Sequence, residues 1–167
     1  MSEKKTTDHV DRVLAQWRRE RPELDVAPMG LLGRLTRLRN HLSREIETVL
    51  QQHDLPTSAF DVLATLRRAG APYRLSPGEL LEMTMVSSGT MTNRIDQLEK
   101  AGFVERVNNP QDRRSVLIAL TDKGFDVIEQ AVTAHVENQH GLVASLDAKD
   151  REELDRLLKK FLAAFEE

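Results

Sequence analysis

A run of polar side chains between residues 87 and 97 has the composition of a surface that reads nucleic acid. Arginine pairs with guanine, asparagine or glutamine pairs with adenine, and hydroxyl groups reach backbone phosphates. If the run is helical, Met91, Ile95 and Leu98 share one face and pack inward, and polar side chains occupy the opposite face. Alone, the run is equally compatible with a polar surface helix. The residues predicted to contact DNA are Ser87, Ser88, Thr90, Asn93, Arg94 and Gln97.

Two further arginines, Arg113 and Arg114, lie in a polar connection between two apolar runs. An arginine on a protruding hairpin fits the minor groove, where the electrostatic potential is most negative. Asp112 precedes them, and we expect it to orient a guanidinium group and not to read a base. A solvated turn is the alternative explanation.

The elements that carry these residues are predicted to be two short helices and a hairpin. Residues 76–79 form a capping box with proline at the first helical position, and Ser87 or Ser88 can cap the next helix, which Gly102 ends. Two short helices separated by a tight turn are typical of a helix-turn-helix. Residues 104–107 and 115–120 then alternate as strands of a hairpin. Residues 54–121 are thus predicted to form a winged helix-turn-helix.

Amphipathic helices are predicted on both sides of this domain. A short helix covers residues 8–20, and a longer one starts near Pro28 and carries apolar residues at three- and four-residue steps as far as Val49. Thr57 or Ser58 can cap the helix that follows, while Thr121 and Asp147 can cap two C-terminal helices. We assign residues 1–26 to an N-terminal extension, and 27–53 with 122–167 to dimerisation, because the long apolar stripe exceeds what a small monomer needs.

Composition excludes several classes of function. The 167 residues include no cysteine, and their five histidines are dispersed, so neither a thiol chemistry nor a metal site is expected. We find no phosphate-binding loop and no catalytic constellation, which predicts a protein that is not an enzyme and needs no cofactor. Aromatic residues make up only 4% of the chain, which disfavours binding of single strands by base stacking. No membrane span or signal core is found, so a cytoplasmic protein is expected.

Residues 87–104 and 109–124 together resemble the MarR family of bacterial transcription regulators. The resemblance extends over residues 28–165, and the Asp-Arg-Arg wing followed by Leu-Thr-x-x-Gly is its most specific part. It implies a mainly α fold with a small β-hairpin, in which two chains interlock and their winged helices bind double-stranded DNA at a palindromic operator. It also implies a repressor that a small effector releases. By position, the resemblance assigns Ser88, Thr90, Asn93 and Arg94 to the major groove, with Arg113 and Arg114 on the wing.

The segment from Trp17 to Asp25 resembles the extra N-terminal helix of the urate-responsive subgroup of that family. The subgroup implies a purine site made by Trp17, Asp61 and Arg94. An indole can pack on a flat ring, an arginine can pair with an anion, and an aspartate can accept ring N–H groups. Asp61 could instead complete a capping box with Ser58. Two other functions stay open: a MarR-type regulator that senses phenolic compounds, and a helical protein-interaction module that binds no DNA.

Overall fold

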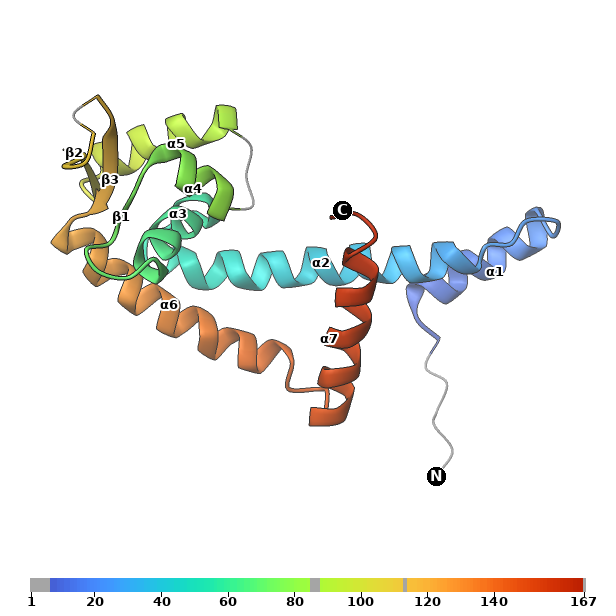
Figure 1. Ribbon diagram of the computed structural model, residues 1–167. Coiled ribbons are helices and arrows are strands. Elements are labelled where there is room, and N and C mark those ends of the chain that lie inside the picture. Colours follow the sequence, from blue (N-terminus) through green and yellow to red (C-terminus); the bar gives the residue numbers. More distant parts are fainter. Residues whose placement is uncertain (1–6, 85–87, 113, 167) are drawn as a thin grey trace. The chain divides into compact units, whose positions relative to one another are not determined.

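The computed structural model describes residues 7–84, 88–112 and 114–166. The chain divides into two compact units, Met1–Glu45 and Ile46–Glu167. Helices dominate the described residues and accompany one small sheet (Figure 1), which confirms the predicted mainly helical fold with a β-hairpin. In chain order the elements are α1 (His9–Glu20), α2 (Ala27–Gln51), α3 (Thr57–Arg68), β1 (Arg74–Leu75), α4 (Pro77–Met83), α5 (Ser88–Lys100), β2 (Val104–Asn108), β3 (Val116–Leu120), α6 (Asp122–Leu142) and α7 (Ala148–Leu162).

In the unit Met1–Glu45, α1 is fixed to the first part of α2 by one arginine. Asp8 caps α1 in a capping box with Asp11, so the predicted short helix is confirmed and begins one residue later than expected. Arg34 of α2 donates to Asp8 Oδ2 at 2.8 Å and to Asp11 Oδ1 at 2.6 Å. A small apolar cluster accompanies these polar contacts. Its buried members are Val10, Leu14 and Val26.

In the unit Ile46–Glu167, α4 and α5 form the predicted helix-turn-helix. Ser76 accepts the Glu79 N–H while the Glu79 carboxylate accepts the Ser76 N–H, so the predicted capping box is confirmed. The chain leaves α5 at Gly102, whose φ of +76° favours glycine. The three apolar residues predicted to face inward are at most 3% exposed. They are Met91, Ile95 and Leu98.

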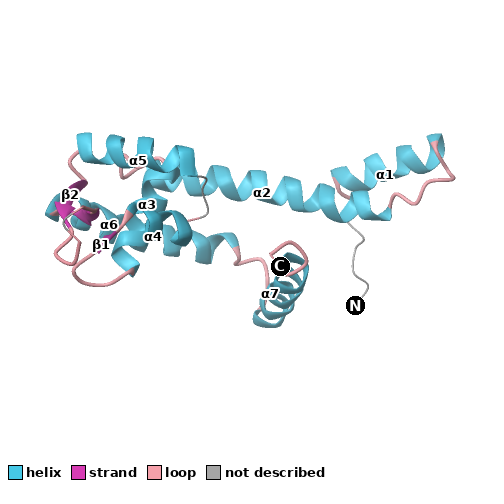
Figure 2. Ribbon diagram, turned by 45° about the horizontal axis from the view of Figure 1, so that its top comes forward, coloured by secondary structure: helices cyan, strands magenta, loops and turns pink. Residues whose placement is uncertain are grey.

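The wing contains one more strand than the sequence predicted. β2 and β3 pair as the expected antiparallel hairpin, with Val104 opposite Leu120. β1 pairs with the other edge of β3, with Arg74 opposite Ala119, which gives the strand order β1-β3-β2. Figure 2 shows the strands in magenta beside the helices in cyan. A strand of two residues has no alternation of its own, so its pairing with β3 is the only signal for it.

The predicted cap of α3 is wrong. Pro56 occupies the N-cap position, no side chain makes a cap hydrogen bond, and both Thr57 and Ser58 lie inside the helix. Proline fixes the extended backbone that precedes a helix, here with φ −66° and ψ 149°, so α3 begins without a hydroxyl cap.

One continuous core joins α3, α4, α5, the sheet and α6. At the start of α6, Gly124 lies against the wing so closely that a Cβ atom there would be 1.9 Å from the Phe103 carbonyl oxygen. Only glycine allows this approach, which sets α6 directly beside the end of α5. The largest fully buried side chains of this unit are Leu50, Leu55, Leu63, Leu66, Leu80, Ile118 and Ile128.

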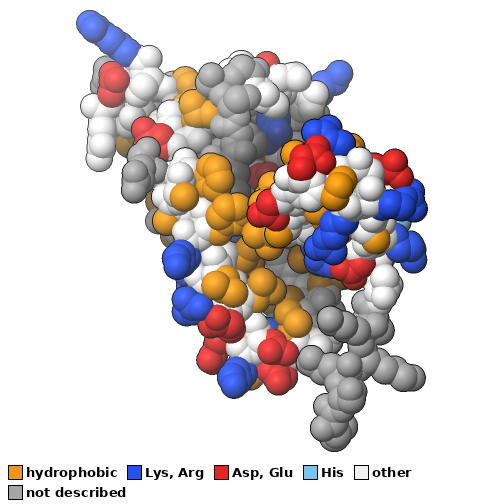
Figure 3. Space-filling model, turned by 90° about the vertical axis from the view of Figure 1, so that its right-hand side faces the viewer, with side chains coloured by type: hydrophobic (Ala, Val, Ile, Leu, Met, Phe, Trp, Pro, Cys, Tyr) orange, Lys and Arg blue, Asp and Glu red, His pale blue; other side chains and the backbone are white. Residues whose placement is uncertain are grey.

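The two C-terminal helices begin as predicted. Thr121 Oγ1 accepts the Gly124 N–H at 3.0 Å, and Asp147 Oδ1 accepts the Asp150 N–H at 2.8 Å. α7 contains no buried residue, although one face of it is apolar. Large hydrophobic side chains of α7 are exposed, and Figure 3 draws hydrophobic side chains in orange. Within the described ranges, no helix has both the length and the apolar character needed to cross a membrane.

Candidate nucleic-acid interface and ligand site

The solvent-facing side of α5 carries side chains that can both donate and accept hydrogen bonds. Thr90, Asn93 and Gln97 are exposed, as the helical periodicity predicted. Gln97 Nε2 lies 3.5 Å from Asn93 Oδ1, so the two amides are neighbours on this surface. A stripe of this kind can match the donor and acceptor pattern of base edges in a major groove. Ser87 and the side chain of Ser88 lie outside the described residues.

Arg94 departs from the predicted exposure. Its side chain is partly buried, and its Nε and Nη1 atoms are shielded from solvent with no hydrogen-bond partner among the described residues. Position 94 lies three residues after Met91 and four before Leu98, so it borders the buried face of α5. The expectation that Arg94 is exposed is therefore wrong, and its contact with DNA stays a prediction.

Asp61 of α3 interacts electrostatically with Arg94 of α5 and with His135 of α6. Burial raises the pKa of the Asp61 carboxyl on α3, while the charges of Arg94, Arg68 and His135 oppose that shift. Burial also lowers the pKa of His135 on α6, and Asp61 opposes this shift in turn. The His135 ring packs against Phe60, with ring centroids 4.9 Å apart. Asp61, Arg94 and His135 form a polar cluster in a poorly solvated place, where charges interact more strongly than in water.

The structure separates the possible roles of Asp61. A cap at the start of α3 is excluded, because no side chain makes a cap hydrogen bond there. Asp61 belongs instead to the polar cluster with Arg94, the pairing that the family resemblance implied. Trp17, the third predicted ligand residue, lies near the end of α1 in the unit Met1–Glu45, and 41% of its surface is exposed.

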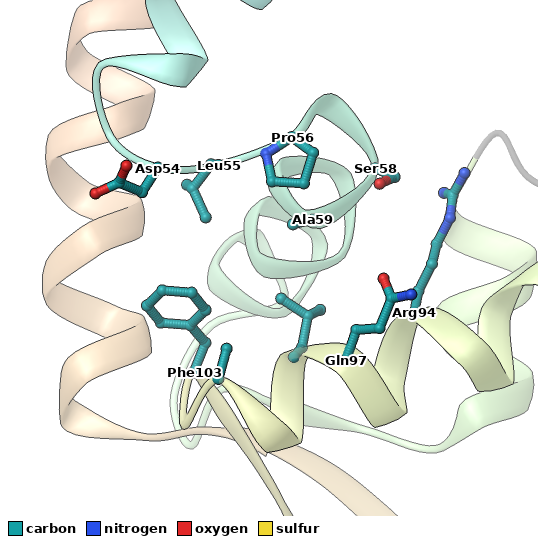
Figure 4. A pocket seen from close by; sticks show the side chains of 10 residues that line it. Asp54, Leu55, Pro56, Ser58, Ala59, Arg94, Gln97 and Phe103 are labelled. Carbon is teal, nitrogen blue, oxygen red and sulfur yellow. The ribbon is translucent and has the colours of Figure 1, made fainter.

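Arg94 also lines a pocket of about 170 Å³ (Figure 4). Figure 4 shows the Arg94 guanidinium and Ser58 near one end of the pocket and Phe103 near the other. An engineered apolar cavity of about 150 Å³ takes up benzene, so this volume suits one aromatic ring. The apolar part of the wall is Leu55, Pro56, Ala59, Leu98, Ala101 and Phe103, and the polar part is Asp54, Ser58, Arg94 and Gln97.

An arginine that sequence reasoning missed joins α5 to the wing. Arg106 of β2 donates to Asp96 Oδ1 at 2.5 Å and also to the Glu99 carboxylate, and both acids are on α5. These contacts fix the rotation of α5 about its own axis relative to the sheet. Acids three residues apart on a helix and a basic residue on the next strand were visible in the sequence, but their meeting depends on the turn at Gly102.

Two polar side chains in the connection between β2 and β3 accept hydrogen bonds from backbone N–H groups. Asp112 Oδ1 accepts the backbone N–H of Arg114 at 3.0 Å, which differs from the expected contact with a guanidinium group. The short side chain of aspartate reaches the amide two residues ahead, as in an Asx turn. Asn109 Oδ1 accepts the Gln111 N–H in the same way. Arg114 is exposed, and Arg113 lies outside the described residues.

Sequence comparisons identify the relatives of this chain. The profile of the MarR family matches residues 55–116. The transcriptional regulator PecS of Dickeya dadantii is 42% identical over 149 residues, which cover 89% of this chain and 90% of PecS. The multiple antibiotic resistance protein MarR of Escherichia coli is 35% identical over 133 residues, which cover 78% of this chain and 90% of MarR.

Solved structures agree with this relationship. A mutant of MarR from Escherichia coli, complexed with operator DNA, matches with a TM-score of 0.71 and 31% identity over 82% of this chain and 95% of that one. AbsC from Streptomyces coelicolor matches with a TM-score of 0.77 over 86% of this chain and 97% of AbsC, and at 24% identity it supports the fold alone. The chain therefore belongs to the MarR family, a non-enzymatic family of DNA-binding transcription regulators.

Proposed function

We propose that this protein is a dimeric repressor that binds a palindromic operator and is released from it by a small anionic, aromatic effector such as urate. The observation that carries the proposal is the exposed polar stripe of α5, held on a winged helix whose fold matches a MarR protein in complex with operator DNA. A recognition helix of this kind reads base edges, while a basic wing contacts the adjacent groove.

The apolar face of α7 supports the dimer. Six large hydrophobic side chains, five on this helix and one three residues beyond its end, remain at least 38% exposed in the single chain, which is unusual for a face with this spacing. A second copy of the chain would cover them and bring two recognition helices to half-sites about one DNA turn apart. The six side chains are Leu154, Leu157, Leu158, Phe161, Leu162 and Phe165.

The polar cluster supports the effector. Asp61 and Arg94 interact across α3 and α5, and Arg94 has two donor atoms with no partner among the described residues, which an anion can engage. An anion bound there pulls on a residue of the recognition helix, so binding of effector and binding of DNA favour different positions of α5. Trp17 completes the proposal as the aromatic side chain that packs on the effector ring.

One alternative effector has support of its own. The pocket beside Arg94 has the volume of a single aromatic ring, which favours a phenolic or benzoate-like compound over a bicyclic purine. The third function left open by the sequence, an interaction module that binds no DNA, has no support from a chain that belongs to a family of DNA-binding regulators.

Fluorescence anisotropy tests the proposal. The full chain is titrated onto duplex DNA from the region upstream of its own gene and onto a scrambled duplex, with and without urate or salicylate. Tight, salt-sensitive and sequence-dependent binding supports the regulator, and reversal by one anion identifies the effector class. Two results together would overturn the proposal. The protein would bind both duplexes with equal affinity, and a genome-wide selection of binding sites would enrich no sequence.

A further inference from the structure

Four buried nitrogen atoms in the unit Ile46–Glu167 have no hydrogen-bond partner among the described residues. Two belong to Arg94 of α5, and the others are His135 Nδ1 and Asn138 Nδ2 of α6. His135 and Asn138 are three residues apart and therefore lie on the same face of α6. Arg94 and His135 belong to the polar cluster with Asp61, and Asn138 follows His135 by about one helical turn. Since most buried polar groups in folded proteins are paired, these unpaired atoms require an explanation.

All four atoms are donors. Arg94 Nε and Nη1 and the Asn138 amide nitrogen can only donate. Gln139 Nε2 lies 2.9 Å from His135 Nε2, and an amide nitrogen is also only a donor, so His135 Nε2 accepts. A neutral imidazole that accepts at Nε2 carries its proton at Nδ1. The unpaired Nδ1 atom of His135 is therefore an N–H group as well.

Donors without acceptors define the missing partner. Each unpaired donor costs free energy when it is buried, and this cost is recovered when an acceptor enters. Asp61 supplies one carboxylate that interacts with Arg94 and His135, yet the four nitrogen atoms have no partner in the described part of the chain. The chemistry that satisfies them is an anion with several oxygen or nitrogen acceptors and few donors of its own.

We propose that His135 and Asn138 of α6 are effector-binding residues, which together with Arg94 hold an anion through its acceptor atoms. This inference rests on the proposed effector response and deepens it, because it names a third helix and the donor character of the site. An anion held in this way connects the recognition helix α5 to α6. Binding then restrains α5 through its Arg94 side chain and leaves the exposed stripe of Asn93 and Gln97 in one fixed position.

Three variants of the full chain test this inference. His135→Phe keeps a ring against Phe60 and removes the donor, and Asn138→Leu removes an amide donor at nearly constant shape. His140→Phe makes the first change at an exposed position of the same helix and serves as the control. Isothermal titration calorimetry gives the Kd for urate and for salicylate, and thermal unfolding gives the Tm without ligand.

We expect His135→Phe and Asn138→Leu each to weaken anion binding by about tenfold to a hundredfold, the effect of losing one hydrogen bond to a charged group. We expect the Tm without ligand to stay the same or to rise, because an unpaired buried donor has been removed. We expect the control, His140→Phe, to have the Kd and the Tm of the wild type. A lower Tm in both variants would show that the donors have partners within the protein, which overturns the inference.

The inference and the proposed function fail in different ways. If the wild-type protein binds DNA specifically but the two variants bind urate or salicylate as well as the wild type does, the inference is wrong and the regulator stands. If the wild-type protein binds neither anion, the inference is wrong too. If the wild-type protein shows no sequence-specific DNA binding, the proposed function is wrong instead. The Kd values from calorimetry do not depend on DNA binding, so they still test the inference.

Discussion

Asp61 of α3 and Arg94 of α5 carry opposite charges on neighbouring helices, and each is partly buried. Their attraction does not offset the burial of the Asp61 carboxyl, because its pKa lies above the ordinary value. Arg94 also keeps two unpaired nitrogen atoms among the described residues. The pair therefore lacks the properties of a stabilising ion pair, and this supports the proposed role of the two residues in binding an effector.

Asp61→Asn is expected to stabilise the protein without ligand at pH 7. Burial raises the folded-state pKa of Asp61, so its contribution to stability is greatest in acid and is lost as the pH rises through that folded-state pKa. The asparagine side chain of the variant does not titrate, so it adds no pH dependence to stability. The Tm difference between the variant and the wild type should therefore grow in favour of the variant between pH 3.8 and pH 7.

Thermal unfolding of the two proteins across that pH range measures the difference. A variant whose Tm is lower than that of the wild type at pH 7 would mean that the attraction between Asp61 and Arg94 outweighs the cost of burial. Titration of the same two proteins with urate, in the presence of DNA, measures the effector response. We expect the variant to lose most of the effector response because it lacks the carboxylate acceptor.

His135 gives stability the opposite dependence on pH. Burial lowers its folded-state pKa below 6.5, so its contribution is present above pH 6.5 and is lost as the pH falls through the folded-state pKa. His135→Phe removes the titration and keeps the ring contact with Phe60. The Tm of the wild type should therefore fall relative to that of the variant between pH 7.5 and about pH 5. Parallel Tm curves for both proteins would contradict the assignment, and His140→Phe controls for the loss of an exposed histidine.

Arg106→Ala is expected to weaken binding to a specific duplex by about tenfold or more while leaving the salt dependence unchanged. Arg106 is engaged by Asp96 and Glu99, so it orients α5 and does not neutralise a phosphate. Arg114→Ala is the matched comparison, since an exposed wing arginine that contacts phosphate lowers the salt slope by about one. Anisotropy titrations at several salt concentrations separate the two effects. An equal change of slope in both variants would mean that Arg106 contacts DNA directly.

Trp17→Phe tests the one proposed effector residue that lies in the unit Met1–Glu45. Phenylalanine keeps an aromatic ring but loses the larger indole surface, so we expect a weaker Kd for urate and a correspondingly weaker release of DNA. Calorimetry gives the first value and anisotropy the second. If both values equal those of the wild type, Trp17 serves only to hold α1 in place.

The local signals in the sequence predicted the elements well. The caps at Ser76, Thr121 and Asp147 and the glycine after α5 each act within four residues, so their side chains and backbone partners can be recognised from spacing alone. β1 was missed because its two residues pair with β3, more than forty residues away. A strand that short is specified by its partner and not by its own pattern.

The candidate site was predicted only in part. Asp61 and Arg94 were named from the family resemblance, but periodicity placed Arg94 on the exposed face, since its position borders two faces of α5. The contacts of Arg106 and the donors of α6 could not be found in this way. They depend on how α5, β2 and α6 pack, and this packing follows from the close approach at Gly124.

The apolar face of α7 leads to the last prediction, that Leu158→Lys separates the dimer and abolishes specific DNA binding. Burying a leucine contributes about 1.5–3 kcal/mol, and two-fold symmetry makes each change count twice. A lone winged helix contacts one half-site, so its affinity should fall towards the non-specific range of about 10⁻⁴–10⁻⁶ M. Because an added lysine attracts DNA, such a loss cannot come from charge repulsion. Glu152→Lys, on the opposite face of α7, is the control, and light scattering reports the mass. Specific binding by a monomeric Leu158→Lys protein would contradict the dimeric repressor.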